Sequence, residues 1–373
     1  MIQALMNNHA SLPLDQSAYY APVPTLAIDA SGVISDFNIA MRLLMHPDIE
    51  GARSRSVDEL RNAIKDRIEG DLFPSNERAN GDRYLSVAHC RYQSPRFGWT
   101  QLRRSGIRYR QADADGSFRT LIFAEVLSAE RADELAEAIG LELRRQLIWE
   151  SYAESYDRVL PLLPFYREVV NRHVKSLSAP GIETVLDLGA GTGNVSVALV
   201  EAGKKVTALD LSRAMLEKLR SKVPTGSRSR LIIQEQNAEH LSQWRNETFD
   251  GVTVLLACYA MASPVRAFME AIRLLRPGGQ LVITEPKRDF QLEPLLAFAD
   301  QFLKQEGLYE KVKDDWERVN SANIELDPQK RDAPLRAEDI VAELESRGFE
   351  DFTIEDSHLG NCATVCARKP KDA

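Results

Sequence analysis

The segment 185–194, VLDLGAGTGN, restricts the fold of this chain more than any other part of the sequence. Its first half is apolar apart from Asp187, as in a strand that is buried on both faces of a sheet. Glycines follow at positions 189, 191 and 193, where the backbone can turn sharply and a ligand can approach it closely. A strand that enters such a turn and then a helix is typical of an open parallel sheet, which binds ligands at the carboxyl ends of its strands.

The chain beyond residue 178 continues this alternation of strands and helices. Strands are predicted over 184–188, 205–209, 230–234, 249–256 and 280–284, and helices over 194–202, 214–222 and 265–275. A helix over 337–347 then precedes two strands, 351–356 and 362–367, whose short connection makes them antiparallel. The predicted fold is therefore α/β: a Rossmann-like, seven-stranded, mostly parallel sheet with an antiparallel last strand.

The charges around the glycines indicate which ligand the turn accepts. A dinucleotide fingerprint would read G-x-G-x-x-G, but Asn194 occupies the place of its last glycine. Asp187 stands two residues before the first glycine, where it would repel a pyrophosphate and suit a cationic amino-acid group. Asp210, at the end of the next strand, can accept the ribose hydroxyls, or alternatively cap a helix together with Ser212. S-adenosylmethionine carries an ammonium and a sulfonium, so these charges favour it over NAD.

Five segments in order, VLDLGAGTGN, ALDLSRAML, QNAEHL, FDGVTVLLACYAM and LRPGGQLVITEP, resemble the class I S-adenosylmethionine-dependent methyltransferases. The resemblance covers about 147–369 and implies S-adenosyl-L-methionine as cofactor and S-adenosyl-L-homocysteine as product. It implies a cofactor site formed by Asp187, Gly189, Ala190, Gly191 and Gly193 along the methionine and ribose, Asp210 at the ribose hydroxyls, Leu211 and Met215 near the adenine, Asn237 and Ala238 beside its ring, and Leu256 and Ala257 facing the cofactor.

The segment 149–157 resembles the lid helix of that family, whose tyrosines close over the cofactor. Tyr152 and Tyr156 are four residues apart and share one helical face. The alternative interpretation is an aromatic stripe that packs on the sheet.

Methyl transfer from a sulfonium is an in-line displacement, which requires alignment, exclusion of water and, for an alcohol or amine, removal of a proton. Bases are expected near the ends of the fourth and fifth strands, where Cys258, Tyr259, Glu285 and Lys287 stand. His358, before the final turn, is a further candidate, with a plain surface residue as the alternative. Tyr259, Glu285 and His358 are the predicted catalytic residues, and no metal site is predicted.

The insertion 287–335 is predicted to be helical and to determine the methyl acceptor. Trp316 and Tyr309 could line an acceptor pocket or pack in a core. The insertion has no basic stripe, and the whole chain carries a net charge of −8 without long blocks of like charge. A small-molecule acceptor is therefore predicted, and nucleic acid is not.

The first third of the chain has a different pattern. Short strands are predicted over 24–30 and 33–37, helices over 38–45 and 57–68, and longer strands over 83–92, 99–110 and 118–127. This order resembles a PAS domain, which implies a role in dimerisation, substrate capping or sensing. A haem-bearing member would need an axial ligand, and His46 and His89 are the histidines available, although packed or solvated side chains are the favoured interpretation.

The predicted organisation is an N-terminal arm (1–20), a PAS-like domain (21–127), a connector helix (128–150) and a methyltransferase domain (151–373). The connector carries an apolar stripe at Leu135, Ile139, Leu143 and Leu147. A homodimer through the PAS-like domain is expected.

Cysteine usage and hydropathy predict a cytoplasmic protein without membrane contact. No apolar run approaches the roughly 20 residues of a membrane span, and residues 1–15 do not form a signal peptide. Cys362 and Cys366 lack the spacing of a zinc site and are interpreted as buried cysteines in the core of the protein. They and the other two cysteines, Cys90 and Cys258, are expected to be reduced.

Three functions fit these features. The leading hypothesis is a small-molecule methyltransferase that acts on an O, N or C nucleophile. The alternatives are a PAS-linked sensor or interaction protein that binds S-adenosylmethionine without catalysis, and an enzyme that uses the sulfonium for other chemistry.

Overall fold

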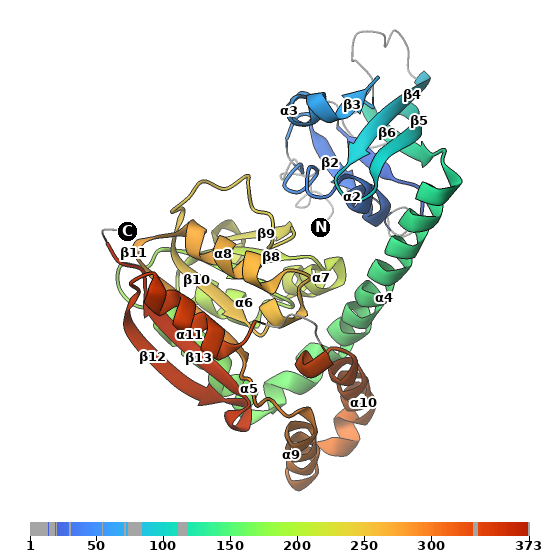
Figure 1. Ribbon diagram of the computed structural model, residues 1–373. Helices are drawn as coiled ribbons and strands as arrows, with labels where there is room; N and C mark the ends of the chain where they lie inside the picture. The colour runs from blue at the N-terminus through green and yellow to red at the C-terminus, as the bar shows by residue number, and fades with distance from the viewer. Residues whose placement is uncertain are drawn as a thin grey trace. The chain divides into compact units, whose positions relative to one another are not determined.

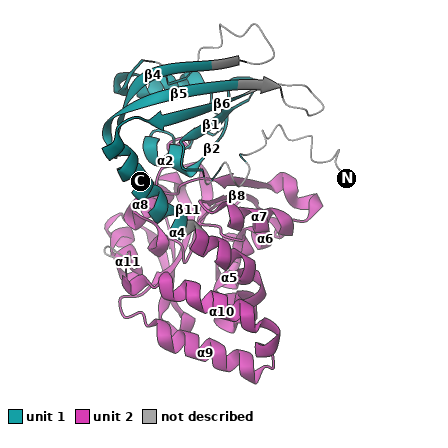
Figure 2. Cartoon of the chain, turned by 90° about the vertical axis from the view of Figure 1, so that its right-hand side faces the viewer, with its two compact units in different colours: residues 1–145 teal, residues 146–373 magenta. Residues whose placement is uncertain are grey.

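The computed structural model describes residues 14, 19, 21–29, 31–53, 55–70, 72–73, 84–110, 118–330 and 335–371. The chain divides into two compact units, residues 1–145 and 146–373 (Figure 2). The predicted arm 1–20 lies almost entirely outside the described residues. Across the described ranges, no helix combines the length and the apolar character needed to cross a membrane.

The first unit contains a six-stranded antiparallel sheet. Its strands are β1 (Thr25–Ile28), β2 (Ile34–Phe37), β3 (Ile68–Glu69), β4 (Tyr84–Ser94), β5 (Gly98–Arg110) and β6 (Phe118–Val126), in the order β2-β1-β6-β5-β4-β3. Between β2 and β3 lie α2 (Ile39–Met45), α3 (Val57–Ile64) and the short 3₁₀ helix η1 (Lys65–Arg67). The helix predicted over 57–68 therefore ends earlier, at Ile64, and Ile68 belongs to strand β3.

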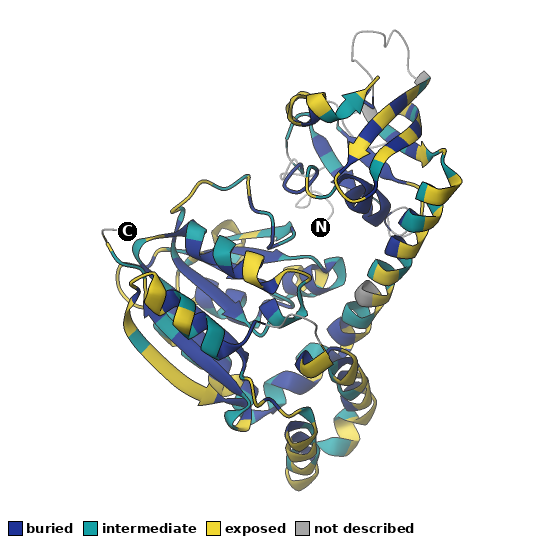
Figure 3. Cartoon of the chain, in the orientation of Figure 1, coloured by how far each residue is buried: buried dark blue, intermediate teal, exposed yellow. Residues whose placement is uncertain are grey.

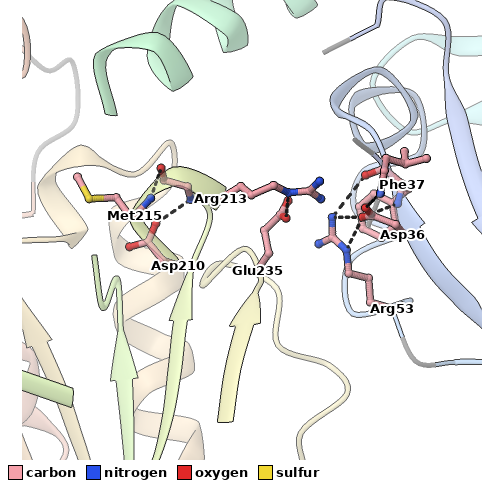
Figure 4. A network of polar contacts seen from close by, with 9 residues as sticks. Asp36, Phe37, Arg53, Asp210, Arg213, Met215 and Glu235 are labelled. Atoms are coloured by element: carbon pink, nitrogen blue, oxygen red, sulfur yellow. Dashed lines mark hydrogen bonds and ion pairs between the residues drawn. The ribbon is translucent and has the colours of Figure 1, made fainter. Parts of the chain in front are cut away.

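One face of this sheet packs against α2 and α3 and forms the core of the unit. Asn38 caps α2 by accepting a hydrogen bond from the Met41 N–H at 2.9 Å. The buried Asp36 carboxylate accepts two hydrogen bonds from Arg53, at 3.1 and 3.0 Å (Figure 4). On the other face of β4 and β5, Val87, Trp99 and Ile107 are exposed.

A single helix, α4 (Ala129–Val159), spans 31 residues. Leu135 and Ile139 are buried in the core of the first unit, and Leu143 packs against that core. Leu147 is 59% exposed, so the predicted apolar stripe ends one step earlier than expected. The predicted connector and the predicted lid helix are thus parts of one uninterrupted helix.

The second unit contains a seven-stranded sheet in the order β12-β13-β11-β10-β7-β8-β9 (Figure 1). Its strands are β7 (Thr184–Leu188), β8 (Lys205–Asp210), β9 (Leu231–Glu235), β10 (Phe249–Leu255), β11 (Leu275–Pro286), β12 (Glu350–Ser357) and β13 (Cys362–Arg368). Strands β7 to β11 are parallel, and β13 runs antiparallel to β11 and β12. The predicted sheet is confirmed, with the reversal of strand order at β7.

Helices cover both faces of this sheet, and its central strands are largely buried, whereas the edge strand β12 is mostly exposed (Figure 3). The helices α8 (Pro264–Leu274) and α11 (Ala337–Ser346) pack on one face. The helices α5 (Pro164–Leu177), α6 (Asn194–Glu201) and α7 (Arg213–Lys222) pack on the other.

The predicted insertion is helical, as expected. It forms α9 (Leu292–Gln305) and α10 (Tyr309–Glu325), whose buried Leu303 and Trp316 pack with Tyr152 and Val159 of α4. Trp316 is 2% exposed, so it belongs to this helical core, whereas Tyr309 is half-buried at its margin.

Candidate cofactor and acceptor site

The three glycines of the turn after β7 all have positive φ angles: 69° at Gly189, 54° at Gly191 and 79° at Gly193. A Cβ at Gly189 would lie 2.4 Å from the Ala257 Cβ, and one at Gly193 would lie 2.1 Å from the Leu219 Cδ1. A Cβ at Gly191 would meet no described heavy atom within 4 Å. Packing therefore requires the outer two glycines, whereas the middle one borders open space that a ligand can enter.

Two carboxylates lie at this turn, Asp187 buried and Asp210 partly buried. Asp187 accepts a hydrogen bond from the Ser196 hydroxyl at 2.6 Å, and Asp210 accepts one from the Gly191 N–H at 2.8 Å. Burial raises the pKa of Asp187 to about 7, and the nearby charge of Asp210 acts in the same direction. Burial also raises the pKa of Asp210. Two desolvated carboxylates beside an open turn favour a cationic ligand.

Asp210 ends β8, as predicted, and its second oxygen accepts the Ser212 N–H at 2.7 Å. The hydroxyl of Ser212, not Asp210, caps α7 by accepting the Met215 N–H at 3.3 Å. At the end of the neighbouring strand, Glu235 holds Arg213 at 2.9 Å (Figure 4). Asp210 thus links the glycine turn to the start of α7 through its two oxygens.

The residues predicted at the adenine and at the end of β10 follow their strands as expected. Asn237 accepts the Glu239 N–H at 2.9 Å through its side-chain oxygen, and Ala238 is buried. Leu256 has a φ of 49°, an uncommon left-handed conformation at the strand end. Ala257 is the residue that Gly189 faces most closely.

The last turns of α4 bring tyrosines together. The rings of Tyr152 and Tyr156 meet edge to face, with centroids 5.0 Å apart. The Tyr152 hydroxyl donates to Asn323 of α10 at 3.1 Å, and the hydroxyls of Tyr156 and Tyr166 lie 2.9 Å apart. Burial raises the pKa of Tyr152 and Tyr156 well above the usual value, and the nearby Tyr259 raises it further. The structure therefore joins both predicted lid tyrosines in one cluster with Tyr259.

A second set of contacts, not predicted from the sequence, ties α4 to the glycine turn. Asp157 accepts hydrogen bonds from the Thr192 hydroxyl at 2.7 Å and from the Lys222 ammonium at 2.9 Å. Lys222 also donates to Asn194 at 2.9 Å, and Asn194 donates to Tyr166 at 3.0 Å. The unusual Asn194 after the last glycine was the one sequence signal for this network.

Glu285 and Cys258, two of the candidate bases, meet at the turn that follows β10. The oxygens of Glu285 accept N–H groups from Ala257 at 3.1 Å, Cys258 at 2.8 Å and Tyr259 at 3.1 Å. Burial raises the pKa of Glu285 to about 7 and that of the Cys258 thiol well above its usual value. Through these hydrogen bonds Glu285 fixes the 3₁₀ turn η5 (Cys258–Ala260).

His358 is 5% exposed, so the alternative of a surface residue is wrong. It lies in the 3₁₀ turn η7 (His358–Gly360), with its ring centroid 4.9 Å from that of Phe165 and its Nδ1 3.2 Å from the Ser357 hydroxyl. Burial lowers its pKa to about 4, so the imidazole is neutral near pH 7. The candidate Lys287, by contrast, forms an ion pair with Asp356 at 3.2 Å.

Comparison with known proteins matches residues 186–283 to a family described as a methyltransferase domain. A demethylmenaquinone methyltransferase of Clavibacter sepedonicus is 32% identical over 143 residues, 37% of this chain and 56% of that protein. A ubiquinone/menaquinone biosynthesis C-methyltransferase, UbiE, of Bartonella quintana is 30% identical over 146 residues, again 37% and 56%. The chain thus spans about half the length of these relatives.

Among solved structures, a Thermotoga maritima protein described as a SAM-dependent methyltransferase, possible histamine N-methyltransferase, is similar, with 20% identity and a TM-score of 0.39. It covers 60% of this chain, which in turn covers 98% of it. Residues 186–283 are thus similar to a methyltransferase domain, and methyltransferases of that family use S-adenosyl-L-methionine and release S-adenosyl-L-homocysteine.

Proposed function

We propose that this chain, through its S-adenosylmethionine-dependent methyltransferase domain, transfers a methyl group to a small-molecule acceptor. The observation that carries the proposal is the open space at Gly191, with the buried carboxylate of Asp187 and the partly buried carboxylate of Asp210 beside it. A glycine that faces open space where a side chain would stand, flanked by desolvated acids, suits the cationic amino-acid part and the ribose of this cofactor.

In the proposed reaction the chain supplies binding, alignment and exclusion of water. Asp187 stabilises the ligand ammonium, and Asp210 accepts the ribose hydroxyls while it positions the turn through Gly191. Tyr152 and Tyr156, neutral at physiological pH, border the site from α4 and keep water away. The bound sulfonium supplies an activated methyl group whose leaving group departs uncharged.

The acceptor side of the proposal rests on the insertion. The family match ends at 283, before α9 and α10 begin. The rings of Phe165 and Phe298 lie 6.2 Å apart, and Phe298 stacks on Phe302 with centroids 6.4 Å apart. This aromatic surface, and relatives named for menaquinone and ubiquinone biosynthesis, support an acceptor with an apolar, aromatic body. Tyr259 and His358 stay the proposed proton acceptors for an O, N or C nucleophile.

We further propose that the first unit is a PAS-like domain that dimerises the chain, with the boundaries given above. Its support is the central pairing of β1 with β6 in an antiparallel sheet that carries exposed apolar residues on one face. The four cysteines are free thiols, which supports a reducing compartment such as the cytoplasm.

Asp210→Ala tests the cofactor site. We expect the affinity for S-adenosylmethionine in calorimetry to fall at least tenfold, about 1.4 kcal/mol, because the ribose contact and the Gly191 hydrogen bond are both lost. Asp351→Ala, which removes an exposed carboxylate of β12, is the control and should bind normally. Unchanged affinity in Asp210→Ala would contradict the site.

A further inference from the structure

Among the described residues, a buried guanidinium that forms no ion pair lies near the end of β11. Arg336 directly precedes α11 and is 6% exposed. Its Nη2 donates to the carbonyl oxygen of Pro328 at 3.1 Å, but its buried Nη1 has no hydrogen-bond partner among the described residues. Within the same ranges it forms no ion pair. Buried charges in proteins are normally paired and hydrogen-bonded, so this donor requires an explanation.

The helix cap does not provide that explanation. The backbone N–H of Arg336, not its side chain, donates to Asp339 at 3.1 Å at the start of α11. Any residue other than proline could provide this hydrogen bond. The guanidinium is therefore not needed to begin the helix, and its burial places a charge where the fold gains little from it.

Arg336 lies near the carboxyl ends of the parallel strands. Arg336 is close enough to Glu285, near the end of β11, to oppose the rise that burial causes in the pKa of that acid. Gln329, next to Pro328, donates to the carbonyl oxygen of Phe290 at 2.9 Å, so this segment packs on the loop that leaves β11. Both oxygens of Glu285 are occupied by N–H donors of the 257–259 turn, so Glu285 does not neutralise the guanidinium by direct contact.

We propose, resting on the methyl transfer proposed above, that Arg336 binds the methyl acceptor as an oxyanion, a phenolate or enolate. Guanidinium groups present planar, always charged donors that suit such oxygens. The bound anion donates an electron pair, from oxygen or from the conjugated carbon, to the methyl carbon. The carbon–sulfur bond breaks as the new bond forms, and sulfur takes its electron pair. An acceptor that binds already ionised transfers no hydroxyl proton at this step, and a carbon acceptor loses its ring proton afterwards.

The test uses the full chain saturated with S-adenosylhomocysteine and 4-nitrophenol as the probe, because its phenolate is visible by absorbance. We expect the bound probe to ionise at lower pH than in water. Arg336→Met should weaken phenolate binding about tenfold or more and abolish this shift, and Arg336→Lys should retain part of it. The neutral analogue 4-nitroanisole should bind all variants equally.

Arg288→Met is the matched control, since Arg288 is an exposed cation of the same region that pairs with Asp339. It should leave probe binding unchanged. Both variants should bind S-adenosylhomocysteine normally in calorimetry, and the melting temperature of Arg336→Met should not fall.

Three results overturn the inference: no binding of the probe by the wild-type chain, equal binding by Arg336→Met, or failure of Arg336→Met to fold, which would make the guanidinium a structural group. Absence of S-adenosylhomocysteine binding by the wild-type chain would instead contradict the proposed function itself.

Discussion

At the scale of single residues, burial sets the protonation of the site in two opposite directions. Desolvation raises the pKa of Asp187 to about 7 and lowers that of His358 to about 4, because in both cases it disfavours the charged form. Near pH 7, His358 is therefore neutral. Asp187 lies near its midpoint, so a ligand cation can complete its ionisation.

This balance predicts a pH-dependent cofactor affinity. Asp187 has a raised pKa, so below about pH 7 it is mostly protonated and must release its proton when a cation binds. We expect the affinity for S-adenosylmethionine to fall by up to about tenfold per pH unit below pH 7 and to level off above it. Calorimetry between pH 5.5 and 8.5 measures this profile.

Asp187→Asn is the control, because an amide oxygen can still accept the Ser196 hydroxyl but does not titrate. It should flatten the profile. A slope of equal size in Asp187→Asn would assign the dependence to another group.

The positions of Asp187 and Asp210 could be predicted because each follows directly from its place at a strand end. The surroundings of Glu285 and His358 could not. Glu285 is occupied by N–H groups of a turn 26 to 28 residues away, and His358 is buried by Phe165 of α5. The sequence pattern around each residue indicates neither of these long-range contacts.

At the scale of elements, α4 shows why helix boundaries are difficult to predict. Its predicted apolar stripe ends at Leu147, and the resemblance to a lid helix begins at Trp149, so the sequence suggests two segments. No proline interrupts 129–159, however, and Gly140 alone does not end a helix. The helix is continuous because nothing in the chain breaks it.

The contacts of α4 with the glycine turn give a prediction at this scale. Asp157→Ala removes the acceptor of both Thr192 and Lys222. We expect a loss of about 1 kcal/mol in the free energy of unfolding, since the pair is partly exposed, and a severalfold weaker cofactor affinity because the turn loses its support. Urea denaturation and calorimetry measure the two effects.

Glu154→Ala is the matched control, because Glu154 lies on the same helix and pairs with Lys218 of α7 at 2.7 Å, but at the surface. It should change neither quantity measurably. Equal effects of the two variants would contradict a specific role of Asp157.

At the scale of the whole molecule, the proposed dimer depends on the exposed face of β4 and β5. Trp99 and Ile107 are 41% and 40% exposed on this face. We expect Trp99→Asp with Ile107→Asp to convert a dimer to a monomer in size-exclusion chromatography with light scattering, because charges there would be buried at the interface. Val265→Asp, at an exposed apolar position of α8, should leave the mass unchanged. A monomeric wild-type chain would contradict the proposal.

The architecture of the second unit was largely predictable, whereas the acceptor side was not. Strand–helix alternation and connection handedness define the order of the parallel strands. The core of α9, α10 and the end of α4 joins segments more than 130 residues apart, such as Val159 and Leu303. Its pairing depends on side-chain shape, for which periodicity offers no signal.

The three glycines of the turn are also expected to be under different evolutionary constraints. Gly189 and Gly193 are fixed by the chain's own Ala257 and Leu219, so a screen that scores only expression or solubility already rejects larger residues there. Gly191 meets no such neighbour, and a screen of that kind would register only its backbone strain. Mutational tolerance at these alternate positions therefore separates the constraint imposed by the fold from that imposed by the ligand.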